Sequence, residues 1–224
     1  MKLKKIKPMR IAIDSTAGSG STSLALKLAK HYKLRYLDTG KVYRWCALQI
    51  IKKKPKNKIK FLKKISRIIS LKKLKSKSLL NDKVSYVASQ IAKDLEIRKL
   101  VVRFQRNLAY NPPKKFRGSI LDGRDINSKI VKDADFKFYI TASTTCRAKR
   151  RVAELRKLGK KVIFNEILKS MKKRDREDRT RKHSRLKKTK ESHLINTTNL
   201  SIKSSFLKVK KIMDRKLNKT WKKQ

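Results

Sequence analysis

A Gly/Ser-rich turn near the start of the chain has the residue types and spacing of a phosphate-binding loop. The stretch IAIDSTAGSGSTS, residues 11–23, joins an apolar run to the amphipathic stretch LALKLAKHY. In the pattern GxxxxGK[ST], glycines let backbone N–H groups curl around phosphate oxygens, and the helix that follows adds its dipole. Gly18 and Gly20 keep this cradle, but Ser15 and Ser21 replace the first glycine and the lysine. Two interpretations stay open: a nucleotide site with altered chemistry, or a ligand-free turn.

The missing lysine bears on rate more than on fold. Removing one preorganised stabiliser of developing charge typically costs about 3–4 kcal/mol, or roughly 10²–10³ in rate. Positioning and other cations remain, so a slowed enzyme is physically possible. We predict that a nearby cation partly replaces the lysine, with Lys27 on the following helix and the more distant Arg174 as candidates.

Three later stretches combine arginine with carboxylates or hydroxyls: YLDTGKVYR at 36–44, LDGRD at 121–125 and KKRDREDRTR at 172–181. Guanidinium groups form paired, planar hydrogen bonds to phosphate oxygens, so arginine is the residue type that a phosphate clamp would use. The spacing of Arg174, Asp178 and Arg181 places them on one face of a helix. The alternatives are surface ion pairs and an exposed helix laced with Arg–Asp pairs.

The elements that must position these residues alternate between strand and helix. Short apolar runs predict strands at 10–14, 34–37, 119–122, 136–140 and 194–196. Apolar residues at helical spacing predict helices over 24–32, 52–77, 83–108, 143–158 and 164–182, and from 202 onward. Gly159 is a candidate C-cap for the helix before it. This alternation predicts an α/β fold with a parallel sheet covered on both faces.

The composition is extremely basic. The 224 residues include 66 Lys and Arg against 16 Asp and Glu, which gives a formal net charge of +50. Such a charge attracts polyanions, so nonspecific contact with nucleic acid is one partner class. The lysines are spread along the whole chain, however, and solvated faces account for most of them. Residues 52–77 hold thirteen basic residues and no acidic one, with apolar residues at helical spacing.

Cysteine usage and hydropathy narrow the protein class further. Cys46 and Cys146 lie far apart and form no CxxC or Cys/His cluster, so we expect no disulfide, no metal held by the protein alone, and a reducing, cytoplasmic location. No run of about 20 apolar residues is present, so we expect no membrane span. The N-terminal MKLKKIKPMR is basic, but only IAI follows before Asp14, which does not fit a secretory signal.

In this order and with these separations, the motifs make the chain resemble the bacterial cytidylate kinases, which are P-loop nucleoside-monophosphate kinases. The resemblance covers nearly the whole length and is carried by LDTGxxYR, by VASQ, IR and QR between residues 87 and 106, by GRD, and by the arginine-rich helix. It implies a three-layer P-loop NTPase-like core with a parallel five-stranded sheet, a reduced helical insert that binds the nucleoside monophosphate, and a helical lid. We expect one domain over 1–224, with its core at about 8–40, 112–160 and 190–222, the insert at about 41–111 and the lid at about 161–189.

The resemblance also implies an activity and a set of site residues. The reaction would move the γ-phosphoryl group of ATP to CMP or dCMP with Mg²⁺, in a protein that is expected to be a monomer. ATP would be bound by the loop residues Ser15, Thr16, Ala17, Gly18, Ser19, Gly20, Ser21, Thr22 and Ser23, with Thr22 reaching the metal through Mg-ATP. The acceptor would be bound by Thr39, Arg44, Ser89, Arg98, Arg124, Asp125, Asp178 and Arg181. The residues nearest the transferring group would be Arg124, Arg174 and Arg181.

Departures from the family pattern keep alternatives open. Ser15 and Ser21 put rate and ATP affinity in doubt, the insert is short and very basic, Arg185 stands where the family usually has proline, and Asn196 stands where an acidic residue is frequent. One alternative is a catalytically weak or inactive relative that acts as a nucleotide- or RNA-binding module, which the +50 charge favours. Sparse aromatics, at 7%, argue against stacking on RNA. A related P-loop kinase with another small acceptor is the third possibility.

Overall fold

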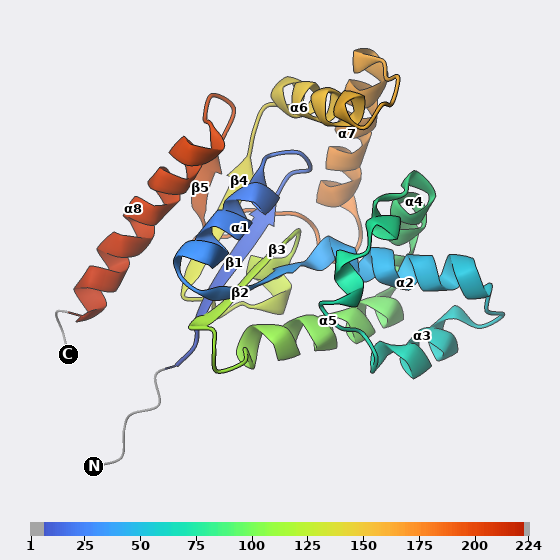
Figure 1. Ribbon diagram of the computed structural model, residues 1–224, viewed down its shortest axis with the longest axis horizontal. Helices are drawn as coiled ribbons and strands as arrows, with labels where there is room; N and C mark the ends of the chain where they lie inside the picture. Colours follow the sequence, from blue (N-terminus) through green and yellow to red (C-terminus); the bar gives the residue numbers. More distant parts are fainter. Residues whose placement is uncertain (1–6, 222–224) are drawn as a thin grey trace, which may run out of the picture.

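A computed structural model describes residues 7–221, and for 219–221 the backbone alone. The first six residues of the basic N-terminal stretch therefore lie outside the described residues. Five strands form one parallel sheet in the order β2-β3-β1-β4-β5 (Figure 1). They are β1 (Met9–Ser15), β2 (Leu34–Asp38), β3 (Gly118–Gly123), β4 (Phe136–Thr141) and β5 (His193–Asn196). Each lies within one residue of its predicted bounds, which confirms the expected sheet.

The helices fill the segments between and after the strands. They are α1 (Ser21–His31), α2 (Thr39–Lys53), α3 (Lys58–Ser66), α4 (Asp82–Ile91), α5 (Leu95–Tyr110), α6 (Thr144–Lys157), α7 (Phe164–Thr180) and α8 (Ile202–Trp221), with short turns η1 (Lys73–Lys75), η2 (Lys77–Leu80) and η3 (Ile126–Ile130). Gly159 follows α6 with a φ of +76°, as its candidate role as a C-cap requires.

Three predicted helices differ from the observed ones. The stretch 83–108 is two helices, because Asp94 caps the start of α5 by accepting a hydrogen bond from the backbone N–H of Ile97. The basic stretch 52–77 is helical only at the end of α2 and in α3, and it then continues through turns. The charged helix predicted over 164–182 ends at Thr180, so Arg181 lies just beyond α7 in an extended conformation.

Apolar side chains cover both faces of the sheet. On one face, residues such as Ile13 and Phe138 pack against Leu28 of α1 and Met213 of α8. The other face joins a core that continues into α2, α4 and α5, with Leu121 among its strand residues. Strands buried on both faces are expected of a parallel sheet between helical layers.

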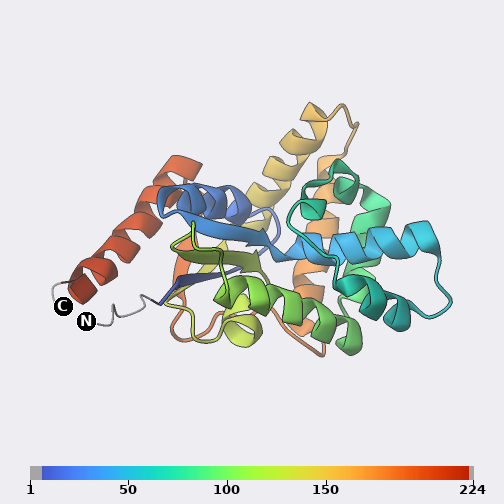
Figure 2. The ribbon, with the colours of Figure 1, turned by 60° about the horizontal axis from the view of Figure 1, so that its bottom comes forward.

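The segment after β2 is built from helices alone. Figures 1 and 2 place α2, α3, α4 and α5 on the side of the sheet away from α8, while α6 and α7 project beyond the end of β4. Between residues 41 and 111, all of which are described, there is no strand. This segment is therefore helical, as expected for the reduced helical insert. Within residues 7–221, no helix is long and apolar enough to cross a membrane.

Candidate active site

The Gly/Ser-rich loop connects the carboxyl end of β1 to the start of α1. Gly18 and Gly20 have φ angles of +75° and +82°, which L side chains rarely adopt, so these two glycines set the curl of the loop. Gly20 is the N-cap of α1 and no side chain caps the helix. The N–H groups of the first turn thus have no side-chain acceptor and face the loop, as an anion site at a helix N-terminus requires.

An arginine of α6 holds the loop in place from behind. Arg147 is 1% exposed, and its Nη1 donates to the carbonyl of Ala17 at 3.0 Å and to Asp175 Oδ1 of α7 at 3.0 Å. Its Nε donates to the carbonyl of Ala142 at 2.8 Å. Arg150 donates to the carbonyl of Ser19 at 3.4 Å. Because Arg147 is buried, it is not part of the solvated surface of α6.

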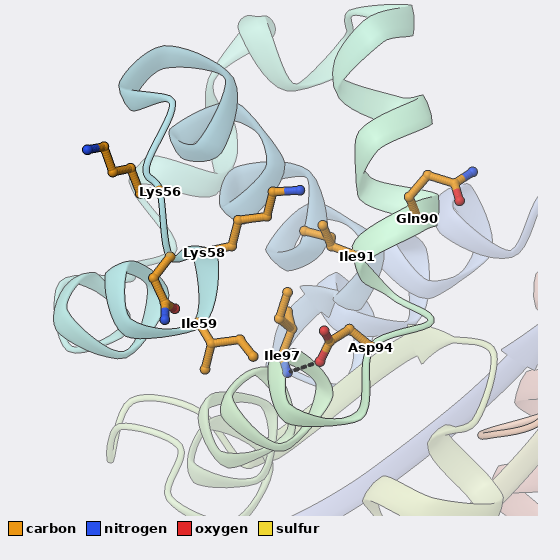
Figure 3. Close-up of a pocket in the computed structure, with 8 residues that line it drawn as sticks. Lys56, Lys58, Ile59, Gln90, Ile91, Asp94 and Ile97 are labelled. Carbon is orange, nitrogen blue, oxygen red and sulfur yellow. Dashed lines mark hydrogen bonds between the residues drawn. The ribbon is translucent and has the colours of Figure 1, made fainter.

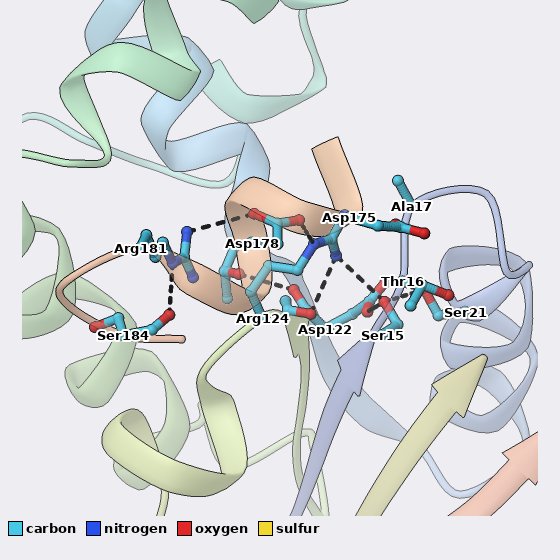
Figure 4. Close-up of polar contacts among 12 residues, drawn as sticks. Ser15, Thr16, Ala17, Ser21, Asp122, Arg124, Asp175, Asp178, Arg181 and Ser184 are labelled. Atoms are coloured by element: carbon cyan, nitrogen blue, oxygen red, sulfur yellow. Dashed lines mark hydrogen bonds and ion pairs between the residues drawn. The ribbon is translucent and has the colours of Figure 1, made fainter. Parts of the chain in front are cut away.

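Hydroxyl groups fill the region around the lysine position of the loop. Ser21 Oγ lies 2.9 Å from Ser15 Oγ and donates to Asp122 Oδ2 at 3.1 Å. Ser15 Oγ donates to Asp122 Oδ1 at 3.2 Å, and Thr22 Oγ1 donates to Oδ2 at 3.1 Å. Figure 4 shows Asp122, at the end of β3, between the loop serines and the arginines of the acceptor side. Three hydroxyls therefore surround one buried carboxylate.

The Asp122 carboxylate is costly to ionise in this position. Burial and the negative charge of Asp38 raise its pKa to about 6, although Arg124 and the hydroxyls of Ser21 and Thr22 act in the opposite direction. Asp38 also caps α2 by accepting a hydrogen bond from the N–H of Lys41 at 3.3 Å. Two carboxylates thus influence each other at the ends of neighbouring strands, beside the loop.

Arg124 links the loop to the segment after α7. Its Nε donates to Asp178 Oδ2 at 2.9 Å, and its Nη1 donates to Ser15 Oγ at 3.3 Å and to the carbonyl of Gly123 at 3.2 Å. Arg181 Nη1 lies 3.6 Å from Asp178 Oδ1, while its Nε donates to the carbonyl of Ser184 (Figure 4). Arg181 Nη2 is buried without a hydrogen-bond partner among the described residues. A buried, unpartnered guanidinium nitrogen is costly unless a ligand such as phosphate accepts from it.

Two further predicted arginines lie near this group. Arg174 is exposed on α7, and Arg44 is half-buried on α2. Although the Arg174 side chain is exposed in part, protein atoms crowd its guanidinium, and this crowding, followed by the positive charges of Arg124 and Arg44, lowers the pKa of Arg174 to about 10. It stays protonated at neutral pH. The charges of Arg124 and Arg44 therefore act on Arg174, while Arg124 and Arg181 are the arginines that pair with Asp178.

A second buried ion pair lies near Arg181. Arg98 of α5 pairs with Asp125 and donates to the carbonyl of Ala92 at 2.8 Å. The guanidinium carbon of Arg98 lies 5.5 Å from the ring centroid of Tyr43. Burial raises the pKa of the Tyr43 hydroxyl, which has no hydrogen-bond partner among the described residues.

Two predicted acceptor residues use their hydroxyls elsewhere in this structure. Thr39 Oγ1 donates to the backbone carbonyl of Asp122 at 2.8 Å. Ser89 is exposed on α4 and donates to the carbonyl of Tyr86 in its own helix, at 2.7 Å. Within residues 7–221, no hydrogen bond joins Ser89 to Arg98 or Asp125, so its role in binding stays a prediction.

Asp14 is a residue of the site that the sequence did not predict. Asp14 is buried at the end of β1 and accepts hydrogen bonds from the N–H groups of Ile126 at 2.6 Å and Asn127 at 3.1 Å. Burial is the main cause that raises its pKa to about 7. By holding η3, Asp14 fixes the chain that follows Arg124 and Asp125. The signal available in the sequence was a carboxylate in an otherwise apolar strand.

The described residues contain no group of three or more His, Cys, Asp or Glu side chains that could hold a metal ion. A hollow of about 480 Å³ lies elsewhere, in the insert, and Figure 3 shows its lining. The lining residues are Lys56, Asn57, Lys58, Ile59, Gln90, Ile91, Asp94 and Ile97. It contains none of the predicted site residues, so the arginine group beside the loop remains the candidate active site.

Comparison with known proteins agrees with this geometry. The family model described as cytidylate kinase matches residues 11–215. Cytidylate kinases from Bartonella tribocorum, Mesorhizobium japonicum and Brucella ovis are 41%, 38% and 35% identical, over 90%, 91% and 97% of this chain and 92%, 93% and 98% of the relative. A crystal structure of an uncharacterized protein from Eubacterium ventriosum matches with a TM-score of 0.55 at 18% identity, over 92% of this chain and 98% of that one, which supports the fold alone. This chain therefore belongs to the cytidylate kinase family.

Proposed function

We infer that the protein transfers the γ-phosphoryl group of ATP to CMP or dCMP, and we propose how its residues share this task. Family membership over residues 11–215 supports the activity. The observation that carries the proposal is the convergence of Arg124 and Arg181 on Asp178, next to the glycine loop. Phosphoryl transfer depends on positioning and charge neutralisation, which such a group supplies. An RNA-binding module with no catalytic role is not favoured.

On the acceptor side, guanidinium groups would hold the monophosphate. Arg44, Arg124 and Arg181 are the proposed clamp, and the unpartnered Nη2 of Arg181 is a donor for a phosphate oxygen. Asp178 would accept from the sugar hydroxyls. The cytosine would be recognised by Thr39, Ser89, Arg98 and Asp125, whose donors and acceptors suit a ring edge that carries an amine and a carbonyl. Because Thr39 and Ser89 now bond to backbone carbonyls, they would have to exchange these bonds for bonds to the base.

On the donor side, the backbone of residues 15–23 would bind the phosphates of ATP. The positive φ angles of Gly18 and Gly20 and the uncapped start of α1 supply the N–H groups for this contact. Arg174 would approach the transferring group from α7 and neutralise charge on its equatorial oxygens. The lysine of the usual loop is absent, so a lower rate than in the lysine-bearing pattern is expected.

The described residues fit a magnesium ion that arrives with ATP. Mg²⁺ is usually bound by one or two carboxylates together with substrate phosphates. Asp122 beside the loop, with Asp38 close enough to raise its pKa, offers this donor set, and Thr22 lies against the same carboxylate. When bound, the ion would neutralise charge on the β- and γ-phosphates.

The chemistry needs no general base. An oxygen of the CMP phosphate forms a bond to the γ-phosphorus, the bond from that phosphorus to the β,γ-bridging oxygen breaks, and ADP leaves with that oxygen. The attacking oxygen is already ionised at neutral pH. The protein's part is to bring the two phosphates together, to neutralise their repulsion and to exclude water, which could otherwise accept the group.

A coupled assay of ADP formation tests the activity. We expect turnover with CMP and dCMP, little with UMP, AMP or shikimate, and loss of turnover when Mg²⁺ is chelated. We also expect CMP to raise the melting temperature of the protein, as a ligand that binds the folded state does. Absence of both turnover and thermal protection with CMP, together with RNA binding that falls steeply with salt, would instead support the nucleic-acid-binding alternative.

Three further properties remain proposals. A monomeric state and a cytoplasmic location fit a small metabolic kinase, and the free thiols of Cys46 and Cys146 are compatible with a reducing compartment. The +50 charge supports nonspecific contact with nucleic acid at low salt. Gel filtration, fractionation of cells and binding measurements over a range of salt concentrations would test these properties in turn.

A further inference from the structure

The two serines that break the loop pattern touch each other. Ser15 Oγ lies 2.9 Å from Ser21 Oγ, and both hydroxyls donate to the carboxylate of Asp122. Ser15 is 1% exposed and Ser21 is 7% exposed, so this contact is inside the protein. The two substitutions, six residues apart in sequence, are therefore neighbours in space at the point where a lysine side chain would leave the loop.

A lysine and Ser15 compete for the same space. The γ-carbon of a lysine at position 21, in the rotamer of Ser21, would take the place of Ser21 Oγ, 2.9 Å from Ser15 Oγ. Close contacts between carbon and oxygen are normally about 3.3 Å or longer. A glycine at position 15 has no side chain and leaves that space open. The loss of the lysine and the gain of the Ser15 side chain are thus sterically linked.

Ser15 also reaches a cation. Arg124 Nη1 donates to Ser15 Oγ at 3.3 Å and to the carbonyl of Gly123, and Arg124 Nε is held by Asp178. No hydrogen bond among the described residues uses Arg124 Nη2, so this donor is left for a phosphate oxygen. Although burial opposes its charge, the carboxylates of Asp178 and Asp122 raise the pKa of Arg124, and the guanidinium stays protonated.

Other cations near the loop are less suited to replace the lysine. Arg147 and Arg150 use donors on the carbonyls of Ala17 and Ser19, behind the phosphate-binding surface. Lys27 is exposed on α1, and no hydrogen bond or ion pair in residues 7–221 joins it to the loop. Arg174 makes no such bond to the loop either. Arg124 is the cation whose side chain contacts a side chain of the loop.

We propose that Ser15 is a positioning residue that holds the Arg124 guanidinium against the loop, so that Arg124 supplies positive charge in place of the missing lysine. The proposal rests on the kinase activity inferred above and adds a specific dependence between positions 15, 21 and 124. Positive charge at the loop can come from a lysine at position 21 beside a glycine at position 15, or from Arg124 held by Ser15. A loop that has only one member of either pair would lack a well-placed cation.

The first test is a four-member cycle of wild type, Ser15→Gly, Ser21→Lys and Ser15→Gly/Ser21→Lys, assayed for kcat and for KM of ATP. We expect Ser15→Gly alone to lower kcat about tenfold, because Arg124 loses its tether. Ser21→Lys alone should bring no gain, because the lysine meets Ser15. The double variant should exceed wild type about tenfold or more. If Ser21→Lys alone gains as much as the double variant, or if Ser15→Gly costs nothing in wild type, the proposal is overturned.

The second test asks whether Ser15 acts through Arg124. Ser15→Ala should lower kcat about tenfold in wild type, but less than twofold in an Arg124→Lys background, where the tethered guanidinium is already lost. KM for CMP and the melting temperature should hardly change with Ser15→Ala, and Ser15→Thr, which keeps the hydroxyl, should retain most of kcat. Equal losses in both backgrounds would show that Ser15 does not act through Arg124.

The same measurements separate this proposal from the inferred activity. Turnover by the Ser15→Gly/Ser21→Lys variant with CMP would confirm a working acceptor site whatever the fate of the serine–arginine arrangement. If no variant, including this one, forms ADP with CMP, the kinase activity itself is contradicted and the proposal falls with it.

Discussion

The donor loop and the acceptor side of the site differ in what carries their chemistry. In the proposed site the loop would contact phosphate through backbone N–H groups, whose directions are set by the φ angles of Gly18 and Gly20, and Arg147 holds the loop in place from behind. The acceptor side depends on side chains, with Arg124 and Arg181 gathered around Asp178. The loop has lost its lysine, whereas the acceptor side keeps all its predicted residues. A backbone cradle tolerates side-chain changes that a guanidinium clamp does not.

The two regions also differ in how fully their polar groups are satisfied. On the loop side, Ser15, Ser21 and Thr22 all donate to Asp122. On the acceptor side, Arg181 Nη2 and the Tyr43 hydroxyl are buried without partners among the described residues. Ser19 Oγ of the loop is buried without a partner as well. The contrast therefore lies at the lysine position, where the hydroxyls are bonded to Asp122, whereas a guanidinium donor of Arg181 is left for a ligand. The predictions below test this contrast.

The largest effect is expected where the loop is anchored. Arg147→Met should lower the free energy of unfolding by about 3–5 kcal/mol, because it leaves the buried carboxylate of Asp175 unpaired. Arg147→Met/Asp175→Leu removes both charges and should lose less. Urea unfolding measures both, with Arg156→Met, an exposed position on the same helix, as the control. A loss of under 1 kcal/mol for the single variant would mean that the loop does not depend on this anchor.

Arg124 contacts both the loop and Asp178, so its removal should affect the donor side and the acceptor side together. Arg124→Ala should reduce kcat by roughly 10²–10³, the usual cost of one preorganised charge stabiliser. We expect KM to rise for ATP as well as for CMP, because the guanidinium contacts both Ser15 and Asp178. Steady-state kinetics against Arg156→Ala would show this. A rise in KM for CMP alone would place Arg124 on the acceptor side only.

The carboxylate inside the loop cluster should make stability depend on pH. Because the pKa of Asp122 is raised from 3.8 to about 6, the folded state holds its proton more tightly than the unfolded state. The resulting stabilisation, roughly 3 kcal/mol, is complete below pH 3.8 and is lost as pH rises through 6. Asp122→Asn should remove this loss.

Unfolding free energies of wild type and Asp122→Asn between pH 4 and 8 measure the effect. The two curves should separate between about pH 4 and 6 and then stay apart, with the variant relatively more stable at pH 8. In both proteins the free energy of unfolding should fall further toward pH 7, because Asp14, with a pKa of about 7, titrates in each. If the unfolding free energies of the two proteins followed the same pH dependence, Asp122 would not be a carboxylate with a raised pKa.

A smaller effect is expected at the exposed end of the acceptor side. Ser89→Ala should raise KM for CMP about two- to tenfold, the value of one hydrogen bond, and leave KM for ATP and the melting temperature unchanged. Ser66→Ala is the matched control, since Ser66 makes the same bond to a carbonyl three residues earlier at the end of α3. An unchanged KM for CMP would remove Ser89 from the base site and leave it a helix residue.

The smallest effect lies outside both regions, where α6 ends. Gly159 has a φ of +76°, and a Cβ there would meet no atom within 4 Å. Gly159→Ala should therefore cost about 1 kcal/mol through backbone conformation alone. Thermal unfolding measures it, and kcat should stay at the wild-type value. A large loss of kcat would show that this turn is coupled to the site.

Much of the fold could be predicted because local signals were strong. Five apolar runs marked the strands to within one residue, and their alternation with amphipathic helices predicted a parallel sheet. The helix boundaries were predicted less well where many charged residues interrupt the spacing of the apolar ones. Apolar residues at helical spacing within the basic stretch 52–77 suggested one helix, and the helix cap by Asp94 was overlooked. Arg147, which is polar by type, gave no sign that it is buried.

The candidate site could be predicted as a set of residues but not as a set of contacts. Motif resemblance named Arg124, Asp178 and Arg181, and the structure brings them together. The contact of Ser15 with Asp122, 107 residues away, depends on the register of β1 against β3 and has no local signature. Ser15 was therefore interpreted only as a lost glycine, and its bond to Arg124 came from the structure.

The buried residues of this protein include nearly equal numbers of cations and carboxylates, although the whole sequence is strongly basic. The buried ionisable residues with charged heads within 7–221 are Arg10, Arg98, Arg147, Asp14, Asp122, Asp125 and Asp175. The buried set has three cations and four carboxylates, so the large positive net charge comes from residues outside this set. Self-repulsion among those residues is screened by salt, whereas interior pairs are screened much less. Moderate ionic strength should therefore strengthen the fold while leaving the internal electrostatics that hold the reacting groups largely unaltered.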